Sequence, residues 1–118
     1  MFNFEKLEVW QKAIDFAELV YTATQAFPAD ERFGLTNQMR RAAVSISSNI
    51  AEGSSRMSKT DFARFLEIAT SSLFEVISQS FISRRRGFLD EEKFACLYSA
   101  TEEQRKMLSG LRRSLLPG

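Results

Sequence analysis

Hydrophobic residues recur every three or four positions along four stretches of the chain, with polar residues between them. This spacing places one apolar face along an α-helix. Pro28, the Glu-Gly-Ser-Ser run at 52–55 and Gly87 separate the four stretches, because proline and glycine interrupt helices. The pattern predicts helices over about residues 7–26 and 35–52, a third helix that opens at Ser58 and a fourth that opens at Asp90.

The connections between these helices are short, and short connections place consecutive helices side by side and antiparallel. A chain of 118 residues is also the length of one domain. The sequence therefore predicts an all-α protein, a single domain over residues 1–118 that folds as an antiparallel up-down-up-down four-helix bundle.

The first and third helices carry more apolar residues than one core-facing stripe requires. The stripe of the first helix that is predicted to face the core consists of Leu7, Trp10, Ile14, Ala17 and Tyr21. Apolar residues outside such stripes, and small residues on a third face of the second helix, suit an interface between copies of the chain. The candidate oligomer interface consists of Val9, Phe16, Val20, Val44, Ala51, Phe74 and Phe81. A wide core closed by long side chains is the alternative use of this surplus.

The charges are segregated along the chain, although the net charge is only +1. Residues 1–33 hold six acidic and three basic residues, a balance of −3, whereas residues 34–87 hold eight basic and four acidic residues, a balance of +4. The first helix is therefore acidic and the middle pair basic. This arrangement suits either contacts between subunits or a polyanion.

Several kinds of chemistry lack their usual residues. The chain has no histidine, the commonest general base and metal ligand, so neither an enzyme nor a metal or other cofactor is expected. Cys96 has no second cysteine to pair with, and its apolar neighbours favour a packing role. No signal peptide or membrane-spanning run is evident, which predicts a cytoplasmic protein without a membrane partner.

The basic residues of the middle helices and their turns are candidates for binding the phosphates of RNA or DNA. They are Arg40, Arg41, Arg56, Lys59, Arg64, Arg84, Arg85 and Arg86. The last three end a helix, where cations are favoured without any ligand. Arg112 and Arg113 form a similar pair with a weaker claim.

A polar stripe on the second helix has a structural alternative to binding. Arg41, Asn49 and Glu52 share one face of that helix, and Glu75 is a candidate partner on the third. Ion pairs of Arg41 or Arg56 with Glu52 or Glu75 would join helices or subunits instead of contacting a ligand. Both interpretations stay open.

The chain carries an ordered set of motifs that resembles the pattern of a family of small four-helix-bundle proteins. These proteins are encoded by intervening sequences of bacterial 23S ribosomal RNA genes. The matching motifs are FEKLEVWQKA at 4–13, FP at 27–28, FGL at 33–35, Gln38, RRAAVSI at 40–46, NIAEG at 49–53, Arg56, FLEIA at 65–69 and SLFE at 72–75. Ser47 departs from the pattern, since many relatives carry proline there.

The resemblance implies a homopentamer without a settled biochemical role. A related resemblance, to the accessory protein of diversity-generating retroelements, implies a basic pentamer that binds nucleic acid and a reverse transcriptase. We therefore expect a non-enzymatic oligomer that binds nucleic acid through a basic face. The alternatives are an oligomeric scaffold for a protein partner and the product of a selfish element without host function.

Overall fold

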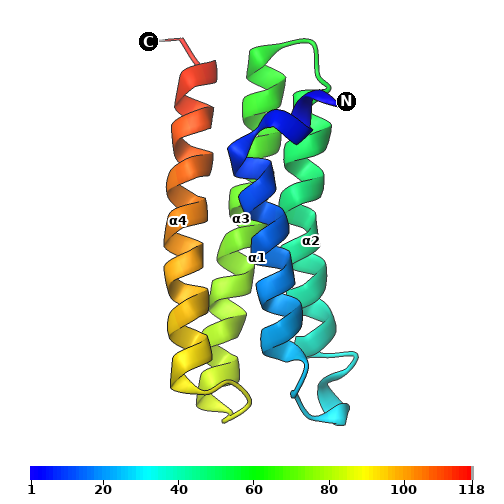
Figure 1. Ribbon diagram of the computed structural model, residues 1–118, viewed down its shortest axis with the longest axis vertical. Coiled ribbons are helices and arrows are strands. Elements are labelled where there is room, and N and C mark those ends of the chain that lie inside the picture. Colours follow the sequence, from blue (N-terminus) through cyan, green and yellow to red (C-terminus); the bar gives the residue numbers. More distant parts are fainter. Residues whose placement is uncertain (118) are drawn as a thin grey trace.

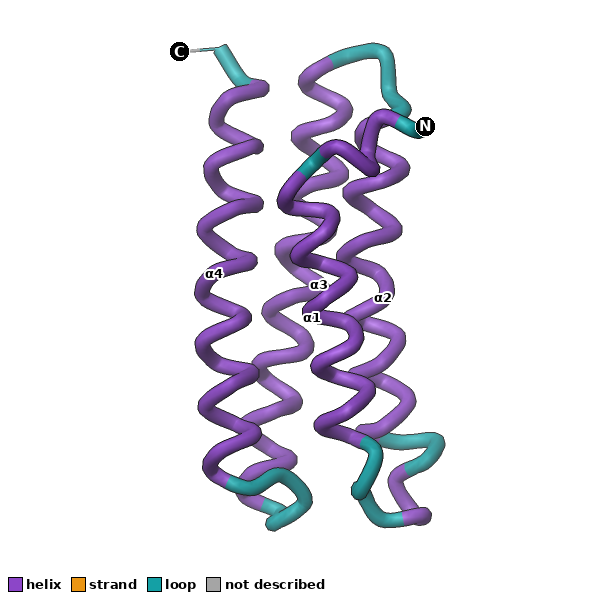
Figure 2. The backbone as a smooth tube through the Cα atoms, viewed as in Figure 1, coloured by secondary structure: helices purple, strands orange, loops and turns teal. Residues whose placement is uncertain are grey.

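The computed structural model describes residues 1–117 and contains four α-helices and two short 3-10 helices (Figure 1). The elements in chain order are η1 (Asn3–Lys6), α1 (Glu8–Thr24), η2 (Ala29–Glu31), α2 (Leu35–Ser54), α3 (Lys59–Arg85) and α4 (Glu91–Leu115). No strand occurs in the part of the chain that the structure describes, and Figure 2 shows only helices and loops. The prediction of an all-α protein with four helices is confirmed.

Each helix packs against its neighbours in the chain, and α1 also packs against α4, so the four helices surround one core. We call these four packed helices the bundle; its extents are 44 × 24 × 20 Å. In Figure 1 the α2–α3 turn, the N-terminus and the C-terminal end of α4 lie together, at what we call the α2–α3 end. The α1–α2 connection and the α3–α4 turn lie at the other end, which we call the α3–α4 end.

Side-chain caps begin the last two helices where the sequence predicted. The hydroxyl of Ser58 accepts a hydrogen bond from the backbone N–H of Asp61 at 3.0 Å. Asp90 Oδ1 likewise accepts from the N–H of Lys93 at 2.8 Å. Each bond satisfies an amide of the first turn that has no partner within its helix, and this fixes where the helix starts.

The end of α3 depends on a glycine. Gly87 has a φ of +78°, a conformation that costs glycine little and other residues more. In this conformation the chain reverses, and the amide of Phe88 donates to the carbonyl of Ser83 at 2.9 Å. The reversal starts the short turn into α4.

The core-facing stripe of α1 differs from the prediction. Val9, Phe16 and Val20 are buried, with exposures of 5%, 3% and 0%, whereas Ile14 and Tyr21 are exposed. The buried stripe consists of Val9, Ala13, Phe16, Val20, Ala23 and, beyond the helix, Phe27. Val9, Phe16 and Val20 therefore belong to the core of the protomer, and their assignment to an oligomer interface is wrong.

The reason lies in the width of the apolar arc on α1. Leu7, Trp10 and Ala17 are half-buried beside the core stripe, so apolar residues cover about half of the helix circumference. Two stripes within such an arc have the same periodicity, and only the positions of the neighbouring helices decide between them. One visible constraint is Gln104 of α4, whose buried side-chain amide donates to the carbonyl of Val9 at 3.1 Å.

The core stripes of the other helices follow their periodicity. Met39, Ala43, Ile46 and Ile50 of α2 are fully buried, as are Leu66, Ala69, Leu73 and Val76 of α3 and Leu97 and Leu108 of α4. Cys96 is exposed on α4, so its predicted packing role is wrong.

Candidate nucleic-acid interface

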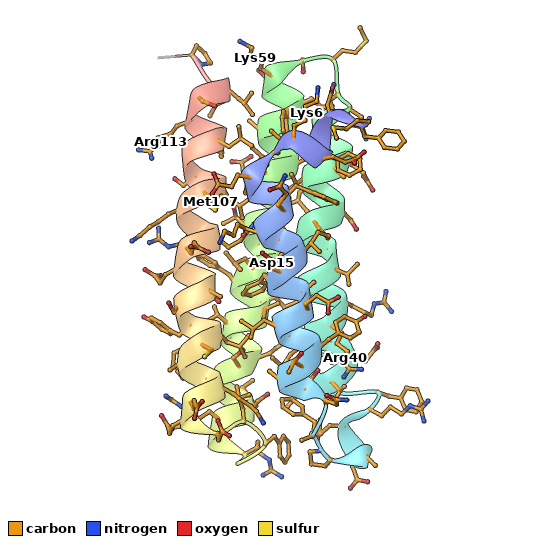
Figure 3. The ribbon with its side chains drawn as sticks, viewed as in Figure 1. Lys6, Asp15, Arg40, Lys59, Met107 and Arg113 are labelled. Atoms are coloured by element: carbon orange, nitrogen blue, oxygen red, sulfur yellow. The ribbon has the colours of Figure 1, made fainter. Side chains whose placement is uncertain are left out.

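The structure does not bring the eight predicted basic residues onto one compact site. Figure 3 shows Lys59 and Arg113 at the α2–α3 end and Arg40 toward the other end. Arg56 and Arg64 flank Lys59, whereas the Arg84–Arg86 run follows 20 residues after Arg64, at the far end of α3. At 1.5 Å per residue, about 30 Å of helix separates the two basic groups.

At the α2–α3 end, two arginines share one carboxylate and one aromatic ring. Arg56 Nε lies 3.7 Å from Asp61 Oδ2, and Arg64 Nε lies 3.1 Å from Asp61 Oδ1. Their guanidinium carbons lie 4.5 and 4.8 Å from the centroid of the Phe65 ring, which is itself buried. Cation–π contacts of this kind hold arginine side chains in place while their outer faces stay accessible.

A third arginine reaches the same region from α4. Arg112 Nη2 donates to Glu67 Oε1 at 2.8 Å, and its Nε is buried without a hydrogen-bond partner among residues 1–117. The three arginines border a surface hollow of about 880 Å³. Its lining includes Ser55, Arg56, Met57, Arg64, Arg112 and Leu116.

The place of Arg112 in this hollow is a contact between α3 and α4 that no motif spacing reveals. The only sequence signal was the Arg112-Arg113 pair in the last turn of α4. It becomes informative once the packing of α4 against α3 sets that turn beside Glu67.

At the α3–α4 end the first arginine of the run has a structural role. The Arg84 guanidinium lies 3.9 Å from the Phe94 ring centroid and 5.3 Å from that of Phe81, and it forms an ion pair with Glu91 at 3.6 Å. These contacts join α3 to α4. Arg85 and Arg86 are exposed.

The two adjacent arginines on α2 also differ, because one contacts another helix and the other is exposed. Arg40 Nε donates to the hydroxyl of Thr24 at 2.9 Å, and its guanidinium lies 4.7 Å from the Tyr21 ring centroid, so this side chain ties α2 to α1. Arg41 is exposed and forms no ion pair within residues 1–117. Only Arg41 of this pair is free to contact a partner.

The predicted polar network forms with other partners. Asn49 donates to the backbone and hydroxyl oxygens of Ser45, at 2.8 and 3.0 Å, and the Ser72 hydroxyl donates to the Ser45 hydroxyl across the α2–α3 contact. Within the described residues, neither Arg41 nor Arg56 pairs with Glu52 or Glu75. The expected direct ion pairs are therefore absent from the protomer.

Glu75 instead belongs to an amide cluster between α2 and α3. The side-chain amide of Gln79 donates to Gln38 Oε1 at 3.1 Å and to Glu75 Oε2 at 3.3 Å. These two bonds satisfy the side-chain nitrogen of Gln79 without placing an arginine there, whereas its Oε1 is buried without a hydrogen-bond partner among residues 1–117.

Exposed apolar residues gather where α3 meets α4. Phe74 and Phe81 are 54% and 43% exposed, and they border a groove of about 310 Å³ with Ile77, Tyr98 and Thr101. Of the other predicted interface residues, Val44 is exposed on α2 and Ala51 is half-buried.

An ion pair forms the polar edge of this groove. Arg105 Nε donates to Glu102 Oε1 at 3.4 Å, and Arg105 Nη2 donates to Glu102 Oε2 at 3.3 Å. Both residues line the groove. The hydrogen bond from Arg105, with its positive charge, holds the pKa of the Glu102 carboxyl below its usual value.

Neither a metal-binding cluster nor a membrane-spanning helix is found in the described part of the chain. No three His, Cys, Asp or Glu side chains lie close enough to hold a metal ion within residues 1–117. Within the same range, every helix is too short or too polar to cross a bilayer.

Comparison with known proteins identifies the family. The family described as 23S rRNA-intervening sequence protein matches residues 5–110. A protein of unknown function from the S23 ribosomal protein family of Bacteroides thetaiotaomicron has a similar solved structure, with a TM-score of 0.81 and 23% identity, covering 89% of this chain and 98% of that chain. At this identity, the similarity shows a shared fold. No curated protein matches the chain. Because the family match spans most of its length, this protein belongs to the family of 23S rRNA-intervening sequence proteins.

Proposed function

We propose that this protein is a non-enzymatic nucleic-acid-binding protein whose contacts come from the basic half of the bundle. The observation that carries the proposal is a set of exposed cations on α2, α3 and their turns without carboxylate partners. Arg41, Lys59, Arg85 and Arg86 form no ion pair within residues 1–117. Such side chains are available to neutralise phosphates and release the counterions that surround nucleic acid.

Charge segregation between the helices supports this proposal. The excess of +4 between residues 34 and 87 belongs to α2 and α3, which pack against each other, whereas residues 1–33 have a balance of −3. A molecule of net charge +1 thus presents a positive half to a polyanion. The family's link to 23S rRNA intervening sequences also associates it with genes for structured RNA.

We extend the proposal to assembly. The bundle runs up-down-up-down and associates into a homo-oligomer in the cytoplasm, and the resemblance to pentameric proteins favours a pentamer. The exposed groove of Phe74 and Phe81 supports self-association, because large aromatic residues at a surface gain most when a partner covers them.

Titration of the unmodified protein tests nucleic-acid binding. Labelled structured RNA and duplex DNA are titrated at several salt concentrations, and fluorescence anisotropy reports the affinity. We expect the affinity for the duplex to fall steeply with salt, with a slope of roughly −0.9 in the logarithm for each phosphate neutralised. Absence of binding at low salt would refute the proposal and leave the arginines with structural roles alone.

The same apolar groove favours a second function, an oligomeric scaffold for a protein partner. Its lining is mostly apolar, with the Glu102–Arg105 pair at one edge. This alternative becomes the leading one if the titration finds no nucleic-acid binding. A native pull-down that recovers no protein, or that recovers the same proteins when Phe74 is replaced by Glu, would exclude it.

A further inference from the structure

We propose that the hollow at the α2–α3 end holds a nucleotide of an unpaired nucleic-acid strand, with its phosphate bound by Arg56, Arg64 and Arg112. The inference rests on the proposed nucleic-acid binding and deepens it, since it names the part of the molecule, the chemical group and the strand form. It also divides the predicted basic residues into those that line a binding site and those at the far end of α3.

The arrangement of charge favours a phosphate. Three guanidinium groups meet at the hollow, whereas the carboxylates they contact are only two, Asp61 and Glu67. The excess positive charge, and the guanidinium N–H groups beyond those that contact the two carboxylates, leave donors for an anion that the protein itself does not supply. Guanidinium groups match phosphate oxygens in geometry as well as charge.

The start of α3 adds backbone donors to the same place. Ser58 caps the helix and lines the hollow, so the positive end of a 27-residue helix faces it. Anions are favoured at such a helix end. The helix end and the three arginines therefore favour the same kind of ligand.

The shape of the hollow and its apolar lining favour an unpaired nucleotide. Its volume of about 880 Å³ lies within the range of about 300–1,000 Å³ of small-molecule sites. Met57 and Leu116 offer apolar contacts beside the arginines, and the fully exposed Met57 gains from being covered. A phosphate joined to a base uses both kinds of lining, whereas the backbone of a duplex keeps its bases stacked inside.

Contacts with the Phe65 ring position Arg56 and Arg64 for stacking against a base. Phe65 is buried, and the guanidinium carbons of Arg56 and Arg64 lie over its ring at 4.5 and 4.8 Å from the centroid. The side chains remain 44% and 58% exposed, so an unpaired base is able to stack on their outer faces. Stacking on arginine planes is a common way for proteins to recognise single strands.

The experiment compares two charge-matched variants, one inside and one outside the hollow. The site variant carries Arg56→Gln, Arg64→Gln and Arg112→Gln. The control variant carries Arg32→Gln, Lys93→Gln and Lys106→Gln, which removes the same charge at exposed residues that do not line the hollow. The probes are one 20-nucleotide sequence as single-stranded RNA, as single-stranded DNA and as an RNA duplex, with thermal melting to verify that each variant is folded.

We expect the site variant to bind either single strand about tenfold or more weakly, and its salt slope to decrease by roughly 0.7, since the site binds one phosphate and single strands contribute about 0.7 per phosphate neutralised. The control variant should bind single strands nearly as the unmodified protein does. Equal losses in the two variants, or equal affinity of the unmodified protein for single strands and duplex, would overturn the inference. Absence of binding to all three probes would instead refute the proposed function itself.

A milder variant separates stacking from charge. Arg56→Lys with Arg64→Lys keeps both positive charges but loses the flat guanidinium surfaces. We expect this variant to lose severalfold more affinity for the single strands than for the duplex. An equal change for all probes would overturn the role of base stacking, even if the glutamine variant fails to fold.

Discussion

Gly53 shows how one residue sets the packing of α2 against α3, close to the proposed site. A Cβ atom at this position would lie 2.8 Å from Phe62 Cδ1 and 2.8 Å from Phe65 Cβ, closer than such atoms pack. We expect Gly53→Ala to destabilise the protein, because overpacking costs about 1–3 kcal/mol and outweighs the 0.5–1 kcal/mol or so that alanine gains in a helix. Urea unfolding followed by circular dichroism measures the difference.

Gly110 is the matched control for this prediction. It also lies within a helix, but a Cβ added there would meet no atom of residues 1–117 within 4 Å, apart from its chain neighbours and the nearby backbone of its own helix. Gly110→Ala should therefore stabilise the protein, by up to about 1 kcal/mol. The opposite signs of the two substitutions are the expected result, and stabilisation by both would show that Gly53 is not tightly packed.

At the scale of the element, α1 tests how far periodicity alone determines a fold. We expect Phe16→Ala to cost about 3–5 kcal/mol of unfolding free energy, because the side chain is buried in the core. Ile14→Ala should cost clearly less than Phe16→Ala, since Ile14 keeps 38% of its surface exposed in the folded protein. Comparable losses would instead support the stripe predicted from the sequence.

A comparison of α1 with α3 and α4 shows what the sequence could and could not predict about each helix. Ser58 and Asp90 carry their own local signals, so the starts of α3 and α4 follow from caps that need no distant partner. The direction that α1 presents to the core depends on contacts with α2 and α4, and its wide apolar arc is compatible with two orientations. Local chemistry therefore predicted the element, and long-range packing decided its face.

At the scale of the whole molecule, part of the candidate site could be predicted from the sequence, and the rest depends on long-range packing. The sequence predicted Arg56, Lys59 and Arg64 among its eight candidate basic residues, and these three lie within ten residues of each other. It could not show that Arg112 joins them, since that requires the end of α4 to return beside the start of α3. Nor could it show that Arg40 and Arg84 are engaged with aromatic rings of neighbouring helices.

Assembly is the remaining property of the whole molecule that the surface allows us to predict. We expect Phe74→Glu to dissociate the oligomer, because it would place a charge in the apolar groove between α3 and α4. Ile14→Glu makes the same change on the exposed side of α1 and should leave the assembly intact. Light scattering with size-exclusion chromatography measures both masses. A monomeric mass for the unmodified protein would remove the role of the groove in self-association, and Phe74 and Phe81 would then be available to a different protein.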